Sequence, residues 1–388
     1  MRSRPAFLAL IIFLVFTSAY VACGRKNLGW KGTITEKDGV VIVKNPKEPL
    51  FKTAEFSIVQ DLKIGQPSGK PEYMLSDIRE IEVDANGNIY AVEFKEYHIR
   101  VFDRNGLYLR TVGRPGQGPG EFGEPGNVHV NPAGEIMATD GGSQSVKVFS
   151  SDGTYLRQCL LKTFYPVKMD YSREGDLFYV MTYSMEPFGF KLFRLDSRTE
   201  ESLSLATWPM PPPDPKRASI FDPIMSFAVM PDDRLLYGCP TEGYEIRIFS
   251  PQGRLEKRVL KDWDPQPVTA KEKEAVLKPR KKRSPSDQTQ LDFPKFHPPY
   301  RVVTSDDQGR IIVYVYSEYT GEPSQKTEGL FDVFDREGRY IAHIRFPFRF
   351  PFRTLIESPL WKAGKLYTVE QDEDGYLYIV RYAVEFNF

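Results

Sequence analysis

Short runs of alternating apolar and polar residues, each followed by a glycine turn, recur along this chain at nearly constant spacing. One copy holds Ile99–Phe102 between Gly87 and Gly106, and the next holds Val146–Phe149 between the glycines at 134 and 153. The glycines of each copy are 19 residues apart, and the copies are 47 residues apart. Alternation with period two predicts half-buried β-strands, and a turn glycine accepts the positive φ of a tight hairpin. This spacing indicates a repeat protein built from small antiparallel sheets.

Counting the copies predicts six units. The strand and glycine pattern returns before Gly253 and Gly338, and a degraded copy occupies residues 175–198. A sixth copy begins at Lys365, but the chain ends before its outer strand, whereas residues 56–65 resemble the strand that ends the first unit. Donation of that N-terminal strand would leave no open sheet edge. We therefore expect an all-β, six-bladed β-propeller whose ring is closed by an N-terminal strand that completes the last blade.

Composition supports a folded, exported chain. Hydrophobic residues make up 41% and aromatic residues 13%, enough for a large core, and the 52 basic residues equal the 52 acidic ones, so nothing favours nucleic acid as a partner. Arg2 and Arg4 precede an apolar stretch over residues 6–16, which is shorter than the roughly 20 residues that span a bilayer. Residues 1–22 are therefore predicted to be a signal peptide.

The end of that signal carries a resemblance of its own. The segment Tyr20-Val21-Ala22-Cys23 resembles the bacterial lipobox, which implies lipidation of Cys23, a membrane anchor and, with Gly24 next, placement at the outer membrane. An ordinary secreted protein or an uncleaved anchor are the alternatives. We expect residues 23–50 to form a tether and lead-in, and residues 51–388 to form the propeller with an inserted helix and loop excursion at 263–299.

A second resemblance concerns the repeats. The run Arg114–Phe122, then Pro125, then Gly134–Asp140 resembles the NHL repeat, and residues 32–388 are similar to exported six-bladed, TolB-like propellers of bacteria, which are often lipoproteins. The resemblance implies binding of a ligand or protein at one face of the ring, without a uniform enzymatic activity.

The candidate ligand-binding residues are polar residues that are predicted to lie near the central channel. Glu93 and Asp140 end the second strands of the first two blades, where they could face the channel mouth or could accept hydrogen bonds from backbone amides. Glu82, His129 and Lys168 are predicted to occupy equivalent positions on the inner strands of three blades. They could bind a ligand or simply be solvated polar residues of the channel.

Catalysis has little support in this sequence. Propeller lyases and lactonases of similar architecture place His, Glu, Asn and Asp around a metal, but this chain has four histidines and no evident set of three converging ligands. No Gly-x-Ser-x-Gly elbow occurs. We therefore expect no metal, no cofactor and no catalysis, and a metal-dependent lactonase- or lyase-like enzyme is the alternative.

The insertion has separate signals. Thr269 and Glu272 form a capping-box pattern that predicts a helix over 270–278. A cluster of cations follows, which could contact an anionic lipid, lipopolysaccharide or an acidic partner, or could be a solvated loop; its members are Lys278, Arg280, Lys281, Lys282 and Arg283. Taken together, the patterns predict a monomeric binding module, tethered to the cell envelope, for a protein, peptide or glycan partner.

Overall fold

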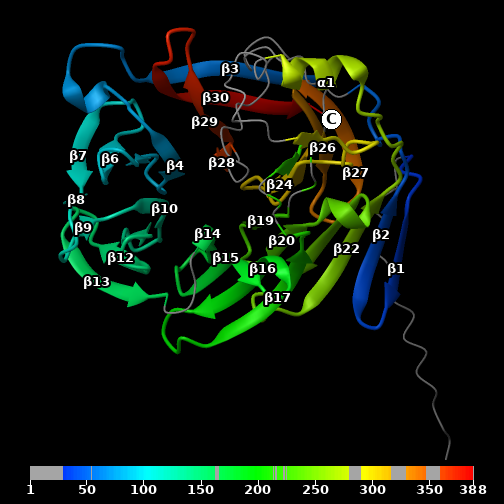
Figure 1. Ribbon diagram of the computed structural model, residues 1–388, viewed down its shortest axis with the longest axis horizontal. Coiled ribbons are helices and arrows are strands. Elements are labelled where there is room, and N and C mark those ends of the chain that lie inside the picture. Colours follow the sequence, from blue (N-terminus) through cyan, green and yellow to red (C-terminus); the bar gives the residue numbers. More distant parts are fainter. Residues whose placement is uncertain are drawn as a thin grey trace, which may run out of the picture.

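Six sheets stand around a central axis in the computed structural model, with their innermost strands nearest the centre (Figure 1). The structure describes residues 29–53, 55–161, 166–212, 214, 216–221, 223, 225–278, 290–315, 329–346 and 359–387. Five of the sheets have four strands, and the fourth sheet along the chain has six. The predicted six-bladed, all-β architecture is confirmed.

Blades 1 to 3 are simple meanders, in which consecutive strands pair from the axis outward. Blade 1 contains β4 (Ile78–Val83), β5 (Ile89–Glu93), β6 (His98–Phe102) and β7 (Tyr108–Val112). Blade 2 contains β10 (Pro125–Val130), β11 (Ile136–Asp140), β12 (Ser145–Phe149) and β13 (Tyr155–Leu160). Blade 3 contains β14 (Pro166–Tyr171), β15 (Leu177–Met185), β16 (Phe188–Asp196) and β17 (Ser202–Pro209).

Blade 5 is also a simple meander, whereas blades 4 and 6 each gain strands from the N-terminal part of the chain. Blade 4 contains β19 (Ser226–Val229), β20 (Leu235–Gly238), β21 (Glu245–Phe249) and β22 (Leu255–Lys261), extended by β2 (Val40–Asn45) and β1 (Thr33–Lys37). Blade 5 contains β24 (Val302–Ser305), β25 (Ile311–Val315), β26 (Gly329–Phe334) and β27 (Tyr340–Phe346). Blade 6 contains β28 (Leu360–Lys362), β29 (Lys365–Gln371), β30 (Leu377–Asn387) and β3 (Glu55–Ile64).

Short elements complete the chain. They are the 3₁₀ turns Pro71–Tyr73 and Pro240–Glu242, the paired β8 (Arg114–Pro115) and β9 (Glu121–Phe122), β18 (Arg217–Ser219), β23 (Gln290–Asp292) and α1 (Ala270–Leu277). No helix among the described residues is long and apolar enough to cross a membrane. Cys159 and Cys239 are both free thiols.

The ring is closed by the N-terminal strand β3, which pairs with β30 as the outermost strand of blade 6 (Figure 1). Its antiparallel register runs from Glu55 opposite Asn387 to Ile64 opposite Ile379. One face of β3 is buried, because Ile64 is 2% exposed and belongs to a core cluster shared with blade 1. The expected closure by a borrowed strand is confirmed.

An N-terminal hairpin also covers the outside of blade 4. Strands β1 and β2 are joined at Asp38 and Gly39, which have φ of 52° and 75°, as the two central residues of a type I′ turn require. Strand β2 then runs parallel to β22. The sequence predicts a tether and lead-in over 23–50; residues 33–45 of that range form this hairpin against blade 4.

A belt formed by residues 45–53 leads from the hairpin to β3 across blade 5. The Asn45 amide donates to the carbonyl oxygens of Leu260 and Gly338, at 3.1 and 2.9 Å, and its oxygen accepts from the Tyr340 backbone N–H at 2.7 Å. The backbone N–H of Leu50 bonds to Tyr340 as well, at 3.0 Å. The belt therefore fastens blades 4 and 5 together before the chain enters blade 6.

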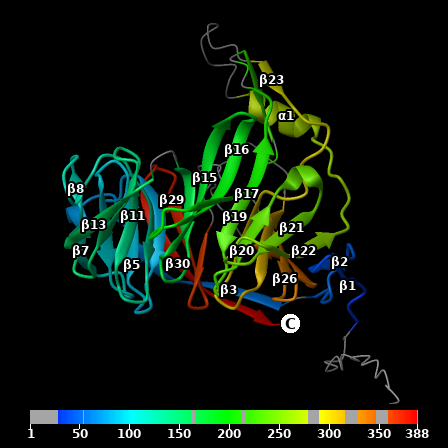
Figure 2. The same cartoon turned by 90° about the horizontal axis from the view of Figure 1, so that it is seen from below.

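The insertion leaves blade 4 at the end of β22. The predicted capping box is present, since Thr269 Oγ1 accepts from the Glu272 N–H at 3.2 Å and Glu272 accepts from the Thr269 N–H at 2.8 Å. Strand β23 pairs in parallel with β18, and α1 and β23 lie together beyond one end of the blades (Figure 2). In an antiparallel blade, strand directions alternate, so the fourth strand ends at the end of the blade remote from the turn between the first and second strands. The insertion therefore starts from the face opposite those turns.

We expect substitution of Ile64 by Ala to weaken the closure of the ring. Loss of a buried isoleucine side chain from a β3 core position should lower the free energy of unfolding by about 2–4 kcal/mol. Urea denaturation followed by circular dichroism measures this change. Val59→Ala on the same strand is the control, because Val59 is 61% exposed and its truncation should cost less than about 0.5 kcal/mol. Equal effects of the two substitutions would show that β3 is not a packed closing strand.

Candidate functional site

A channel pocket of about 430 Å³ lies where the six innermost strands meet. Residues of β4, β10, β14, β19, β24 and β28 line it, together with the turns that join first and second strands. Its mouth is therefore at the turn face of the ring, away from the start of the insertion. Among the described lining residues, seven carboxylates face three lysines or arginines and one histidine. The channel pocket is acidic.

Its polar side chains form two rings, which can be counted from the hairpin turns. In blades 1 to 3 the mouth ring stands five residues before the first turn glycine, and its members are Glu82, His129 and Asp170. The inner ring stands two residues earlier on the same strands, and its members are Glu80, Asn127 and Lys168. Because side chains two residues apart share one face of a strand, both rings point to the axis, about 6–7 Å apart along it.

This count corrects one prediction. Lys168 is predicted from the sequence to be the equivalent of Glu82 and His129, but it belongs to the inner ring, and Asp170 occupies the equivalent position in blade 3. The burial patterns agree, since Met169 and Tyr171 are the buried residues of β14 at the positions of Ile81 and Val83 on β4. A shift of two residues keeps a side chain on the same face, so alternation alone could not detect the error.

The mouth ring is held by ion pairs. Glu82 Oε2 lies 3.8 Å from His129 Nδ1, and Glu82 Oε1 accepts from Lys362 Nζ at 3.3 Å. Burial opposes ionisation of Glu82, but the bonds with His129 and Lys362 outweigh it and lower the pKa of this carboxyl. The His129 ring also stacks on Tyr171, with 5.2 Å between ring centroids. The structure therefore brings Glu82 and His129 together, as the sequence predicts, at the channel mouth.

The inner ring links neighbouring blades. Asn127 donates to Glu80 Oε2 at 3.1 Å and accepts from the Met169 N–H at 2.9 Å, which connects the innermost strands of blades 1, 2 and 3. Lys168 Nζ donates to the carbonyl oxygen of Phe227 in blade 4 at 3.1 Å. These residues therefore have a structural role in addition to lining the channel.

Glu80 is a strongly perturbed carboxyl of the channel. Burial raises its pKa to about 7, and nearby Lys168 opposes that shift only in part. The amide of Asn127 is its single hydrogen-bond donor among the described residues. The buried Tyr171 hydroxyl of the same wall also has no hydrogen-bond partner there. The channel therefore offers a poorly satisfied acceptor within reach of a ligand.

Burial is also the largest cause of the pKa shifts of the two charged channel residues of blade 3. It raises the pKa of Asp170, whose oxygens accept from the backbone N–H groups of Tyr171 and Val229, both at 2.8 Å. Burial lowers the pKa of the Lys168 ammonium, although Asp170 and Glu80 favour its charged form. Sequence reasoning missed Glu80 and Asp170; counting five and seven residues back from each turn glycine would have found both.

The structure places Glu93 and Asp140 in the blade walls, where they accept hydrogen bonds from backbone amides and do not face the channel mouth. Glu93 is 0% exposed and accepts from the Ser76 hydroxyl and N–H and from the Asp77 N–H. Asp140 is 2% exposed, accepts from the Gly123 N–H and pairs with Lys147 at 2.7 Å. Burial opposes ionisation of Asp140, but the Lys147 ammonium and other donors outweigh it and lower its pKa. Neither residue lines the channel pocket.

The remaining predicted positions lie away from the channel. Lys278 is the C-cap of α1 and is exposed. Arg280, Lys281, Lys282, Arg283 and Cys23 lie outside the described residues. Within the described part of the chain, no group of three or more His, Cys, Asp or Glu residues could hold a metal ion.

Comparison with known proteins agrees with this architecture. Residues 69–206 match the DUF5128 family model, described as a 6-bladed beta-propeller. The chain is a six-bladed β-propeller. A solved structure of a member of the DUF4221 family from Bacteroides vulgatus aligns with a TM-score of 0.53 and 12% identity, covering 85% of this chain and 99% of that one. At that identity the likeness concerns the fold alone.

Two further solved structures are more distant. A gluconolactonase from Xanthomonas campestris aligns with a TM-score of 0.44 and 12% identity, covering 80% of this chain and 88% of that one. A virginiamycin B lyase from Staphylococcus aureus aligns with a TM-score of 0.43 and 10% identity, covering 85% of this chain and 99% of that one. Likeness at this level carries no argument about activity. No curated protein sequence matches the chain.

We expect Glu80→Gln to stabilise the fold only at neutral and alkaline pH. In the folded protein this carboxyl has a pKa of about 7, above its ordinary value of 4.5, so wild-type stability falls as pH rises between these values. The variant should therefore match wild type near pH 4.5 and exceed it by about 1–3 kcal/mol at pH 8, measured by urea denaturation.

Glu135→Gln is the matched control. Arg157 lowers the pKa of Glu135, so this pair contributes stability above the unfolded pKa and loses it as pH falls. The difference between variant and wild type should therefore have the opposite sign at pH 8. A Glu80→Gln effect that does not change with pH would contradict the raised pKa of Glu80.

Proposed function

We propose that this propeller is a binding module held at the cell envelope, whose channel binds a ligand with an ammonium or guanidinium group. A basic side chain or free amino terminus of a peptide or protein partner is the ligand that this chemistry favours. The channel pocket of about 430 Å³ is within the range of sites for small ligands, so it would accept one such group and its neighbours.

The poorly satisfied Glu80 carboxyl carries this proposal. A carboxylate with one amide donor has unused acceptor positions, and a cationic donor would supply charge-assisted hydrogen bonds. The excess of seven carboxylates over three lysines and arginines in the described lining would attract a cation to the mouth. An uncharged glycan would gain nothing from this excess, so the channel favours a peptide or protein.

Attachment at the envelope rests on the sequence before residue 29. The signal peptide and lipobox pattern precede the hairpin of residues 33–45, which anchors the chain to the outside of blade 4. A lipid on Cys23 would therefore be separated from the folded ring by about ten residues. The relation to NHL-repeat and TolB-like propellers stays a prediction, as do the monomeric state and the contact of the insertion cations with an anionic surface.

The metal-dependent lactonase or lyase is the weaker candidate. Such chemistry needs three or more ligands around an ion, and no such group occurs within the described residues. The ionisable residues of the channel are instead bound to backbone groups and to one another, as for Asp170 and Lys168. No observation on the described residues favours catalysis over binding.

We expect the C-terminally amidated tripeptides Gly-Lys-Gly and Gly-Arg-Gly to bind the full chain, and the uncharged Gly-Gln-Gly counterpart, acetylated at its amino terminus and amidated at its carboxyl terminus, not to bind. Glu80→Gln should weaken binding about tenfold, because a charge-assisted bond contributes about 1.5–3 kcal/mol. Protonation of Glu80 should also weaken binding about tenfold between pH 8 and pH 6. Isothermal titration calorimetry at both pH values measures these changes.

Glu256→Gln is the control for this titration, because Glu256 lies on the outer strand β22 and pairs with Arg254 at the surface. Its affinity for the tripeptides should equal that of wild type. Binding that is unchanged in Glu80→Gln, or equal affinity for the acetylated uncharged peptide, would contradict a cation site in the channel.

Cys23→Ser should release the protein from the membrane. With the intact signal peptide, wild-type protein expressed in a Gram-negative host should sediment with membranes and carry a lipid on Cys23, visible by mass spectrometry. The variant has no thiol to modify and should remain soluble after export. Wild-type protein with an unmodified cysteine, or with its signal cleaved elsewhere, would rule out the lipoprotein assignment.

A further inference from the structure

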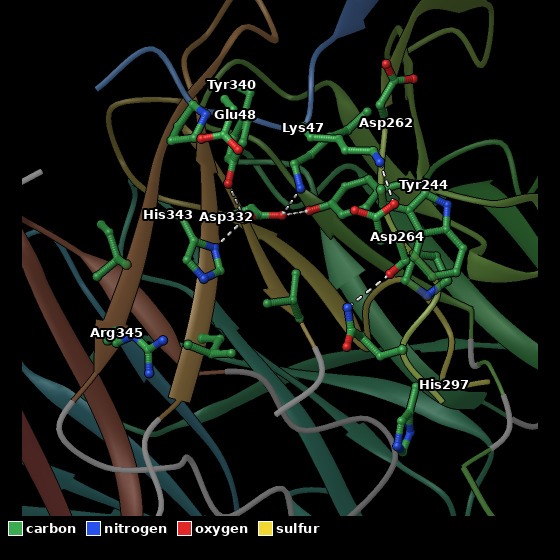
Figure 3. A pocket seen from close by; sticks show the side chains of 18 of the residues that line it. Lys47, Glu48, Tyr244, Asp262, Asp264, His297, Asp332, Tyr340, His343 and Arg345 are labelled. Carbon is green, nitrogen blue, oxygen red and sulfur yellow. Dashed lines mark hydrogen bonds and ion pairs between the residues drawn. The ribbon is translucent and has the colours of Figure 1, made fainter. Parts of the chain in front are cut away.

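A second and larger hollow, the lateral cleft, lies outside the ring. It has a volume of about 1450 Å³ and is bounded by blade 5, the end of blade 4, the belt and the insertion (Figure 3). Two of these boundaries, the belt and the insertion, are segments that do not belong to the blade repeat. Binding of a ligand in this cleft would be independent of the function proposed for the channel.

One buried residue of blade 5 departs from the repeat at this cleft. The residue two positions before the phenylalanine that ends the third strand is a cation in blades 1, 2 and 4, namely Arg100, Lys147 and Arg247. In blade 5 the same position holds Asp332, which is 1% exposed. A buried carboxylate in place of a cation is not required by the propeller fold, since other blades form without it.

Four donors surround this carboxylate. Tyr340 and His343 Nδ1 each lie 2.8 Å from Oδ1, while Tyr244 at 2.5 Å and Lys261 Nζ at 3.1 Å contact Oδ2. Figure 3 shows the two tyrosines reaching Asp332 from different sides, with His343 below it. Burial opposes ionisation of Asp332, but these donors outweigh it and lower the pKa of the carboxyl. Asp332 is therefore an acceptor on both oxygens.

The bond to Asp332 fixes the tautomer of neutral His343. Because a carboxylate can only accept, Nδ1 carries the proton and Nε2 keeps a lone pair. The His343 side chain is 38% exposed and lines the lateral cleft. Within the described residues, no hydrogen bond reaches Nε2. The Asp332 network thus presents one oriented acceptor to the cleft.

Charge in the lateral cleft is nearly balanced, in contrast to the channel. Five carboxylates and four lysines or arginines line its described part. Several are already paired across the cleft walls, as Lys47 with Asp264, and Glu272 with His297 at 3.0 Å. No net field is left to select an ion. A ligand for this cleft should therefore be uncharged and able both to donate and to accept hydrogen bonds.

We propose that the lateral cleft binds an uncharged oligosaccharide, with a sugar hydroxyl donating to His343 Nε2. A hydroxyl both donates and accepts hydrogen bonds, so sugar hydroxyls can bind the anionic as well as the cationic side chain of each ion pair in the cleft walls. The indole of Trp263, partly buried against the core of blades 4 and 5, supplies an apolar wall for a sugar face. The volume exceeds that of usual small-ligand pockets, which favours several sugar units over one.

Calorimetric titration of the full chain with neutral hexasaccharides tests this assignment. The probes are the α-1,4 hexamer of glucose and the β-1,4 hexamer of N-acetylglucosamine. His343→Leu removes the acceptor and should weaken binding of the recognised hexamer about tenfold or more. His343→Gln restores an acceptor oxygen and should remain within about threefold of wild type.

His98→Gln is the matched control, because His98 is a partly buried histidine of blade 1. It should bind as wild type does. If His343→Leu fails to fold in a thermal-shift assay, Trp263→Ala provides the second variant, with the same expected loss of affinity. Absence of binding of both hexamers, unchanged affinity in His343→Leu or Trp263→Ala, or tighter binding of a neutral peptide than of either hexamer would overturn the proposal.

Discussion

The pairing of β3 with β30 is the constraint on which the rest of this molecule depends. It joins residues as far apart as Glu55 and Asn387 and covers the outer edge of β30, which would otherwise be unpaired. Only a closed ring holds the six innermost strands close enough for inner-ring side chains to reach the next blade, as Asn127 and Lys168 do. The geometry of the channel therefore follows from a contact at the outer rim of blade 6.

The fold could be predicted from the sequence because its blades repeat, whereas the lateral cleft lies where the belt and the insertion interrupt that repeat. Turn glycines and alternating strands predict each blade and the borrowed strand, since both are local patterns. The hairpin of residues 33–45 carries an equally local Asp-Gly signal, which the expectation of a tether obscured. Lys168 was placed two residues out of register because alternation repeats every two residues and cannot show such a shift.

The buried carboxylates show a different limit of sequence reasoning. Glu93 and Asp140 have the residue type and strand position expected of channel ligands, yet their oxygens accept from backbone groups of the segment before their own blade. Asp332 has a similar burial, but its network ends at His343 beside an open cleft. Tyr244 lies just before β21, Lys261 ends β22 and His343 lies on β27, so no spacing along the chain predicts their meeting at one carboxylate.

The belt has a mechanical consequence. A force that pulls on the chain before Trp30 is transmitted first to the hairpin and the parallel β2–β22 pair, which must slide along its whole length to separate. Asn45 then distributes the load to the backbones of blades 4 and 5. Strand β3 is reached only after these attachments fail. The hairpin and the belt thus shield the closing strand of the ring from tension applied at the N-terminal side.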